Sequence, residues 1–269
     1  MREIAERAWF LACLTLGRLL RAGRYSTVLI IDQDGERQVR KRRRFYAPIL
    51  VWLGSPLVRF LNAGIRVLPQ REWEEREREA YRRLRGASVQ IDDDTLILPR
   101  LAGETLATVL ENATSGDSVR KRAIELAVVA LAELHNAGLT HADAMAENVM
   151  VDLEAGAAHW FDFETVHDPN RPIAWRRADD VRALLATCLV RTVPEQFAET
   201  LALILDVYAE EGVTRLVAPS FTSVLRRPLT FHLGQAPLSL QGFRQIAGLL
   251  KERLATPERR TGRDTDAAS

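Results

Sequence analysis

The stretch HADAMAENVMVDLEAGAAHWFDFE, from His141 to Glu164, sets a histidine, two aspartates and an asparagine at fixed offsets among apolar residues. NVMVD and AAHWFDFE flank the turn LEAG, which predicts a β-hairpin centred near Ala155. Asn148 and Asp162 are equidistant from that centre, so we expect them to face each other across the two strands. An amide oxygen beside a carboxylate suits Mg²⁺, which usually takes few protein ligands.

Asp143 lies five residues before Asn148, in the loop that precedes this hairpin. A carboxylate there can accept a proton from a hydroxyl group beside the metal, while Asp162 holds the metal itself. Phosphoryl transfer requires this division of labour between two carboxylates. An ordinary solvated acidic loop is the alternative interpretation of the same residues.

With this spacing, the stretch resembles the catalytic and metal-binding segments of the protein-kinase-like superfamily. His141, Asp143 and Asn148 match its H-x-D-x-x-x-x-N pattern, and Asp162 matches the aspartate of its D-F-G motif. The resemblance implies an α+β, bilobal fold with a small β-rich N-lobe and a larger helical C-lobe. It also implies ATP and Mg²⁺ (or Mn²⁺) as ligands, Asp143 as the base, and Asn148 and Asp162 as the metal ligands. We expect His141 to be a structural anchor bonded to backbone carbonyls.

The resemblance further implies a strand lysine that holds the phosphates. The chain has three lysines among its 37 basic residues, and Lys41 lies on a strand predicted over 36–44, taken as the third strand of the N-lobe. Strand alternation puts Val39 on the same face, where an apolar side chain would contact the adenine. Alternatively, Lys41 is merely one cation of the run 40–44.

A helix predicted over 71–85, ended by Gly86, offers five glutamates as the partner of Lys41. Glu77 falls on the apolar stripe of this helix, and a carboxylate on the buried face needs a cation. Glu77 is therefore the expected partner, with Glu79 or Glu74 as alternatives.

The sequence RRADDVRALL resembles the family helix whose aspartate braces the catalytic loop. Asp180, directly before the apolar pattern, is the expected brace. Asp179 could equally be a helix cap. Further helices are predicted over 118–135, 179–191 and 195–211 from their apolar spacing.

We expect the chain to divide into an N-terminal amphipathic helix (1–24), an N-lobe (25–101), a C-lobe (102–255) and a disordered tail (256–269). An insert over 45–69 interrupts the N-lobe, and its residues 45–58 include no charged side chain. It is too short to cross a bilayer. The insert fits peripheral contact with a membrane, because tryptophan and arginines accompany its apolar residues, or it packs as additional core.

Three departures separate the chain from regulated protein kinases. The phosphate-covering loop around Gly23 is poor in glycine, Ala142 replaces an arginine, and Glu164 replaces the glycine of the D-F-G motif. Only 17 residues separate Asp162 from Asp180, which leaves little chain for a peptide-docking platform. The chain therefore looks most like the bacterial lipopolysaccharide-core (Kdo) and RIO-like small kinases.

Composition limits the kinds of partner and the cellular compartment that we expect. A chain of 269 residues that is 47% hydrophobic can bury a substantial core, and its net charge of +1 does not favour nucleic acid as a partner. Two distant cysteines are expected to be free thiols in a reducing compartment. We expect a cytoplasmic protein, at the inner face of the membrane if the insert binds lipid.

These features predict an ATP-dependent kinase that phosphorylates a hydroxyl of a glycan, lipid-linked sugar or small molecule. A RIO-like serine/threonine protein kinase and a pseudokinase that binds or scaffolds without transfer are the alternatives. A metal-dependent hydrolase with His141, Asp143 and Asp162 as ligands is less favoured, because the other histidines are scattered along the chain.

Overall fold

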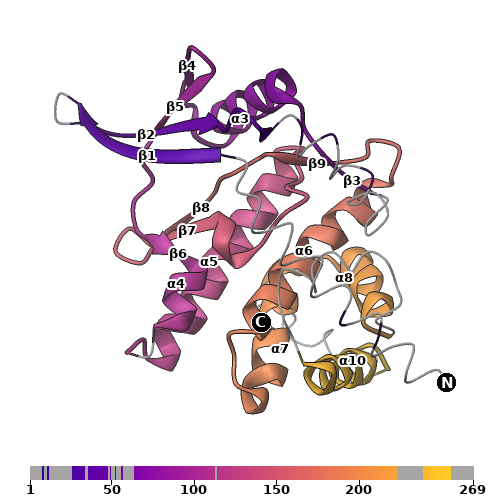
Figure 1. Ribbon diagram of the computed structural model, residues 1–269. Coiled ribbons are helices and arrows are strands. Elements are labelled where there is room, and N and C mark those ends of the chain that lie inside the picture. The colour runs from indigo at the N-terminus through magenta and orange to yellow at the C-terminus, as the bar shows by residue number, and fades with distance from the viewer. Residues whose placement is uncertain are drawn as a thin grey trace, which may run out of the picture.

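The structure, a computed structural model, describes residues 26–33, 36–47, 64–112, 114–222 and 239–255, with the single residues Ala8, Leu11, Ile49, Trp52 and Pro56. The helix predicted over 1–24, the loop around Gly23, most of the insert over 45–69 and the tail over 256–269 lie outside the described residues. The described part is an α+β fold, as predicted, with a β-rich region followed by a mainly helical region (Figure 1).

A four-stranded antiparallel sheet forms the β-rich region. Its order is β1 (Ser26–Gln33), β2 (Glu36–Arg43), β5 (Thr95–Pro99) and β4 (Gln90–Asp92). The predicted hairpin about residues 34 and 35 is confirmed, because Ser26 lies opposite Arg43 in the register. The strand that carries Lys41 is the second strand of the described residues rather than the third.

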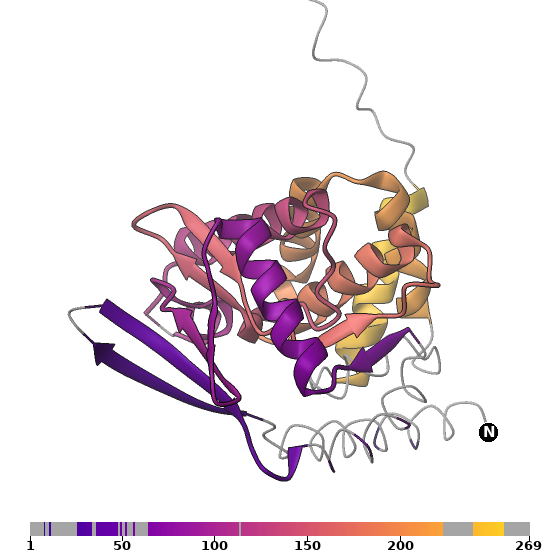
Figure 2. The ribbon, with the colours of Figure 1, turned by 90° about the horizontal axis from the view of Figure 1, so that it is seen from above.

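Helix α3 (Gln70–Arg85) packs against this sheet. It ends as predicted at Gly86, whose left-handed φ of 61° lets its N–H bond to the carbonyl of Arg82. Its buried face joins a compact apolar cluster with the sheet, made of Leu68, Trp73, Tyr81, Val89, Leu96 and Leu98. From above, the β1–β2 hairpin projects to one side while α3 lies against the helical region (Figure 2).

A short two-stranded sheet joins the two regions. β3 (Ile65–Val67), just before α3, pairs antiparallel with β9 (Thr165–His167), just after the predicted metal ligand Asp162. The N–H of Leu68 extends the pairing to the carbonyl of Glu164 at 2.9 Å. The segment directly before α3 is thus bound by backbone hydrogen bonds to the end of the predicted site.

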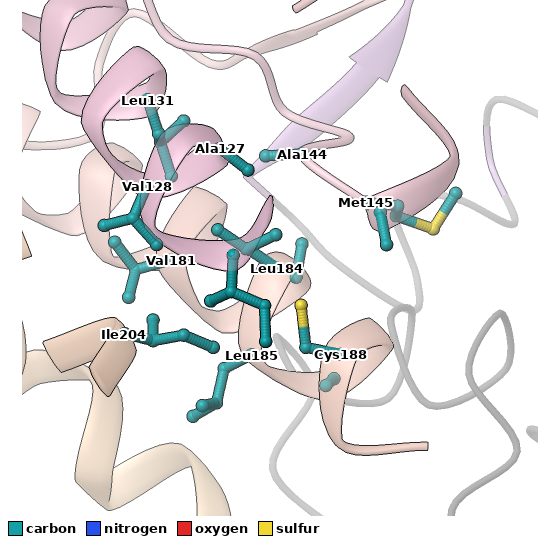
Figure 3. Packing of buried hydrophobic residues seen from close by; sticks show 14 of the residues in the cluster. Ala127, Val128, Leu131, Ala144, Met145, Val181, Leu184, Leu185, Cys188 and Ile204 are labelled. Atoms are coloured by element: carbon teal, nitrogen blue, oxygen red, sulfur yellow. The ribbon is translucent and has the colours of Figure 1, made fainter. Parts of the chain in front are cut away.

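The helical region holds the larger apolar core. Its helices are α4 (Leu106–Glu111), α5 (Asp117–Asn136), α6 (Ile173–Leu189), α7 (Phe197–Tyr208), α8 (Glu211–Val217) and α10 (Leu240–Ala255), with 3₁₀ turns η1 (Ala146–Asn148), η2 (Pro194–Gln196) and η3 (Ala218–Thr222). Ala144 and Met145, the two residues after Asp143, belong to the same apolar cluster as side chains of α5, α6 and α7, and Figure 3 shows Ala144 beside Ala127 of α5. This packing anchors the loop that carries Asp143. None of the helices in the described ranges has the length and apolar character needed to cross a membrane.

Two predicted helix boundaries are wrong. α6 begins at Ile173, six residues before the predicted start, because Pro172 supplies an N-terminal boundary that the apolar pattern does not mark. α7 ends at Tyr208 rather than 211, because Ala209 adopts a left-handed φ of 54° and stops the helix.

The hairpin register differs from the prediction by one residue. β7 (Val149–Asp152) and β8 (Ala157–Trp160) pair with Val149 opposite Trp160, and β6 (Glu104–Thr105) adds a third strand beside β7. Asn148 therefore lies level with Phe161, whose N–H bonds to its carbonyl at 3.0 Å, and not with Asp162. The cause is the turn of four residues that ends at Gly156 (φ 66°), which centres the hairpin between residues 154 and 155.

Replacing Gly103 with alanine tests the junction between the two regions. Gly103 has a left-handed φ of 86°, and a Cβ there would lie 2.0 Å from the carbonyl oxygen of Val151. We expect G103A to lower the free energy of unfolding by about 2 to 4 kcal/mol, measured by urea denaturation. Gly248→Ala is the control, because it lies exposed in α10 with open space around it. A loss in G103A no larger than in G248A would contradict this close approach.

Candidate functional site

Lys41, on β2, lies within a group of three carboxylates. Its Nζ is 2.5 Å from Oδ1 of Asp162, 3.0 Å from Oε1 of Glu164 and 3.3 Å from Oε1 of Glu77. The predicted pair of Lys41 and Glu77 is confirmed as a contact. Burial alone would lower the pKa of Lys41, but the three carboxylates outweigh it and hold that pKa above its ordinary value. Lys41 is therefore charged.

Glu77 is the glutamate of α3 that contacts Lys41. Its Oε1 also accepts hydrogen bonds from Nε1 of Trp73 at 3.3 Å and from the N–H of Phe163 at 3.1 Å. The alternatives lie elsewhere on the helix: Glu79 pairs with arginines at the surface, and Glu74 bonds to Gln70. Glu77 is fully buried, and this burial raises its pKa.

Val39 and Lys41 line one cavity of about 240 Å³, as the strand alternation predicts. Other walls of this cavity come from β1, β5 and the hairpin, and they include Leu98, Met150 and Asp162. A second cavity, of about 600 Å³, is lined by Arg42, Arg43 and Arg44 with their neighbours and contains none of the predicted site residues. The smaller cavity is thus the one that joins an apolar wall to the charged group.

Asp143 lies in the loop between α5 and β7. Its Oδ2 accepts a hydrogen bond from Nδ2 of Asn148 at 3.0 Å, whereas its buried Oδ1 has no hydrogen-bond partner among the residues that the structure describes. Burial, with the nearby charges of Asp162 and Glu147, raises the pKa of Asp143 to about 8, although the bond from Asn148 acts in the opposite direction. A carboxyl group that titrates near neutral pH is suited to exchange a proton with a substrate.

The side-chain oxygens of Asn148 and Asp162 are of the kind that Mg²⁺ accepts as ligands. Nδ2 of Asn148 donates to both the carbonyl and Oδ2 of Asp143, and neither bond uses the amide oxygen. Asp162 adopts a left-handed φ of 69° just after the hairpin, and its half-buried carboxylate bonds to Lys41 through Oδ1. Within the described ranges, no three His, Cys, Asp or Glu side chains form a ready-made metal cage. Asn148 and Asp162 supply hard oxygens of the kind that Mg²⁺ accepts in small number.

His141 is the structural anchor that was predicted. It is fully buried, and its Nε2 donates to the carbonyl of Phe161 at 2.8 Å. Burial lowers the pKa of His141 to about 4, so the ring is neutral at physiological pH. Its ring also lies against those of Trp160 and Phe163, with centroids 5.3 and 4.7 Å away. His141 thereby supports the residue directly before Asp162.

Asp180, on α6, braces the same loop from the other side, as predicted. Its Oδ2 accepts from the N–H of His141 at 2.8 Å and its Oδ1 from the N–H of Ala142 at 2.7 Å. Burial by itself would raise the pKa of Asp180, but His167 and a bond from His135 bring it below its ordinary value. Asp180 is therefore ionised and holds the loop at Ala142, which has a left-handed φ of 66°.

Asp179 is not a helix cap, because α6 begins six residues earlier. Its carboxylate is buried and bonds to Nη1 of Arg182 at 2.5 Å and to Nε2 of His167 at 3.3 Å. Asp179 thus belongs to a buried polar network beside the brace.

Replacing Asp180 with alanine is expected to lower the free energy of unfolding by about 2 to 4 kcal/mol, because two buried N–H groups lose their acceptor. Urea denaturation measures the loss. Glu154→Ala, in the exposed turn of the hairpin, is the matched surface control and is expected to change stability by less than about 0.5 kcal/mol. Equal stability of both variants would remove Asp180 as the brace.

Arginines of α3 also contact the loop and the hairpin that follows it, which the sequence analysis did not predict. Nη2 of Arg76 donates to the carbonyl of Thr140 at 2.7 Å, and Nη2 of Arg85 donates to that of Trp160 at 2.6 Å. Arg83 reaches the carbonyl of Ala137 at 3.3 Å. The spacing of seven between Arg76 and Arg83 was the available signal, since it places both on one face of the helix.

Comparison with known proteins adds no family to this picture. No protein-family model matches the chain, and no curated protein matches it significantly. The interpretation of the site therefore rests on the residues and contacts described above. Those contacts link Lys41 to Glu77 and Asp162, and Asp143 to Asn148.

Proposed function

We propose that this protein is an ATP-dependent phosphotransferase that phosphorylates a hydroxyl group of a glycan, lipid-linked sugar or small molecule. The observation that carries the proposal is the ion pair of Lys41 with Asp162, together with the buried carboxyl of Asp143, whose pKa the charge of Asp162 raises. A bilobal kinase-like arrangement accounts for a β-rich region with α3 set beside a helical region that carries the loop.

In the proposed reaction, the acceptor oxygen attacks the γ-phosphorus of ATP. A new P–O bond forms, the bond from the γ-phosphorus to the β,γ-bridging oxygen breaks, and ADP leaves with the bonding electrons. The proton of the hydroxyl passes to Asp143. Lys41 binds the phosphate oxygens, Glu77 orients Lys41, and Val39 contacts the adenine. Asn148 and Asp162 would hold Mg²⁺, which neutralises charge on the phosphates when bound.

A non-protein acceptor agrees with the short segment between Asp162 and α6. This segment contains β9, which is already paired with β3. Little chain then remains to bind a peptide, so a RIO-like protein kinase is the less favoured kinase alternative.

Peripheral contact with a membrane fits the exposed aromatic residues at the insert. Phe45 is 95% exposed and Trp52 is 74% exposed, and Arg42 to Arg44 lie directly before them in the chain. Aromatic and basic side chains together bind the surface of an anionic bilayer. A cytoplasmic enzyme at the inner face of the membrane would have access to lipid-linked acceptors.

A pseudokinase that binds a partner without transfer is the second candidate function. Glu164 favours it, because its carboxylate contacts the ammonium group that a kinase uses for phosphates. In this alternative, the fold is retained for binding and the transfer step is absent.

Incubation with ATP labelled at the γ-phosphate separates these functions. Purified protein is mixed with lipid, glycan and protein fractions of its host, and label in the lipid or glycan fraction is the expected result. Label confined to the protein fraction would overturn the non-protein acceptor. No label in any fraction, despite binding of Mg-ATP, would favour the pseudokinase.

A further inference from the structure

Glu164 is held in place at Lys41 by contacts from the β-rich region. Its Oε1 lies 3.0 Å from Nζ of Lys41 and accepts a hydrogen bond from Oγ of Ser26 at 2.5 Å. Its backbone carbonyl accepts the N–H of Leu68. The side chain is 14% exposed, so the contact with Lys41 is largely shielded from water.

Lys41 donates hydrogen bonds to Glu77 and Asp162 and forms an ion pair with Glu164. An ammonium group has three N–H donors, and three carboxylates lie within 3.3 Å of it: Glu77, Asp162 and Glu164. The three carboxyl groups outnumber the ammonium of Lys41, and the guanidinium of Arg43 is a further cation that interacts with them. A phosphate oxygen that binds Lys41 therefore competes with these carboxylates, and the negative charge of Glu164 repels it.

Glu164 is the carboxylate best suited to be displaced. Glu77 is fully buried and is held by Trp73 and Phe163, and Asp162 is a proposed metal ligand. The Glu164 side chain, by contrast, contacts the Ser26 hydroxyl and the shared ammonium and is partly exposed, so rotation of this side chain would release its contact with Lys41.

On the basis of the proposed nucleotide site, we propose that Glu164 is a specificity-determining residue that makes nucleotide binding depend on a divalent metal. It competes with phosphate oxygens for Lys41 and repels negative charge. A nucleoside triphosphate without metal carries more negative charge than its metal complex, so Glu164 opposes binding of the metal-free nucleotide more strongly. The site thereby selects the metal complex, which is the form of the nucleotide that donates the γ-phosphoryl group.

Replacing Glu164 with glutamine tests this role, because the side chain keeps its size and loses its charge. We expect E164Q to bind ATP in EDTA about tenfold more tightly than the wild type, since one repelling charge a few ångströms from the phosphates is removed. Affinity for Mg-ATP is expected to change by less than about threefold. Isothermal titration calorimetry gives both dissociation constants, and their ratio is the measure of metal dependence.

Two further variants make the test specific. Glu154→Gln removes the same charge from an exposed turn of the hairpin and should leave the ratio unchanged. Ser26→Ala keeps the charge of Glu164 but removes the hydroxyl that holds it, so it should shift the ratio in the same direction as E164Q and by less. S26A also supplies the test if E164Q does not fold.

The failures are distinguishable. A wild-type protein that binds Mg-ATP, with a ratio that neither E164Q nor S26A alters, overturns the role of Glu164 and leaves the proposed function standing. Folded E164Q that loses Mg-ATP binding would make Glu164 a required ligand and overturn competition. Failure of the wild-type protein to bind Mg-ATP would overturn the proposed function, and this inference with it.

Discussion

Replacing Asp143 with asparagine is expected to lower the rate of phosphoryl transfer by about 10²- to 10⁴-fold, because the variant has no carboxylate to accept the proton of the acceptor hydroxyl. Binding of Mg-ATP is expected to change little, since the amide can keep the contact with Asn148. Single-turnover transfer and calorimetry measure the two effects separately. A variant that transfers phosphate as fast as the wild type would remove Asp143 as the base.

The same variant is expected to be more stable than the wild type above neutral pH. The pKa of Asp143 is about 8 in the folded protein, against about 4 in an unfolded chain. The folded state thus favours the protonated form, and stability falls as pH rises from about 4 to about 8. Asparagine avoids this loss, so D143N should gain about 1 to 3 kcal/mol at pH 8 and less towards pH 4.

The pH dependence of activity follows from the same pKa. Because Asp143 must lose its proton to act as a base, wild-type kcat/KM should rise with pH towards about 8.

Urea denaturation of D143N and wild type across this pH range tests the predicted difference in stability. Equal stability of both proteins at pH 8 would show that the carboxylate bears no burial cost.

Replacing Lys41 with methionine is expected to lower the free energy of unfolding by about 3 to 5 kcal/mol, because the fully buried carboxylate of Glu77 then lacks a cation. Glu164 and Asp162 lose their shared partner as well. Nucleotide binding should also be lost. Chemical denaturation and calorimetry with Mg-ATP measure these effects, and Arg42→Met, on the exposed face of the same strand, is the control.

The double variant K41M/E77Q separates the two consequences. Neutralising Glu77 removes the unpaired buried charge, so part of the lost stability should return. Nucleotide binding should not return, since the ammonium is still absent. Recovery of both would mean that Lys41 serves the fold alone.

Local features of the site were predictable from the sequence. Glu77 could be selected as the partner of Lys41 because the spacing of apolar residues and the stop at Gly86 define the helix and its buried face, and Glu77 lies on that face. The face shared by Val39 and Lys41 follows from strand alternation in the same way. The loop supports, His141 and Asp180, came from the spacing of a resemblance, and the structure confirms their backbone contacts.

Contacts between distant segments depended on the tertiary structure. The hairpin register shifted by one residue, because a four-residue turn ending at Gly156 sets the pairing. The pairing of β3 with β9, and the bond from Ser26 to Glu164 across 138 positions, have no local pattern that predicts them. The sequence by itself determined which helix and strand faces are buried, since periodicity is a property of neighbouring residues. Only packing decided that Glu164 would share Lys41 with Glu77 and Asp162, because that contact requires three separate segments to meet.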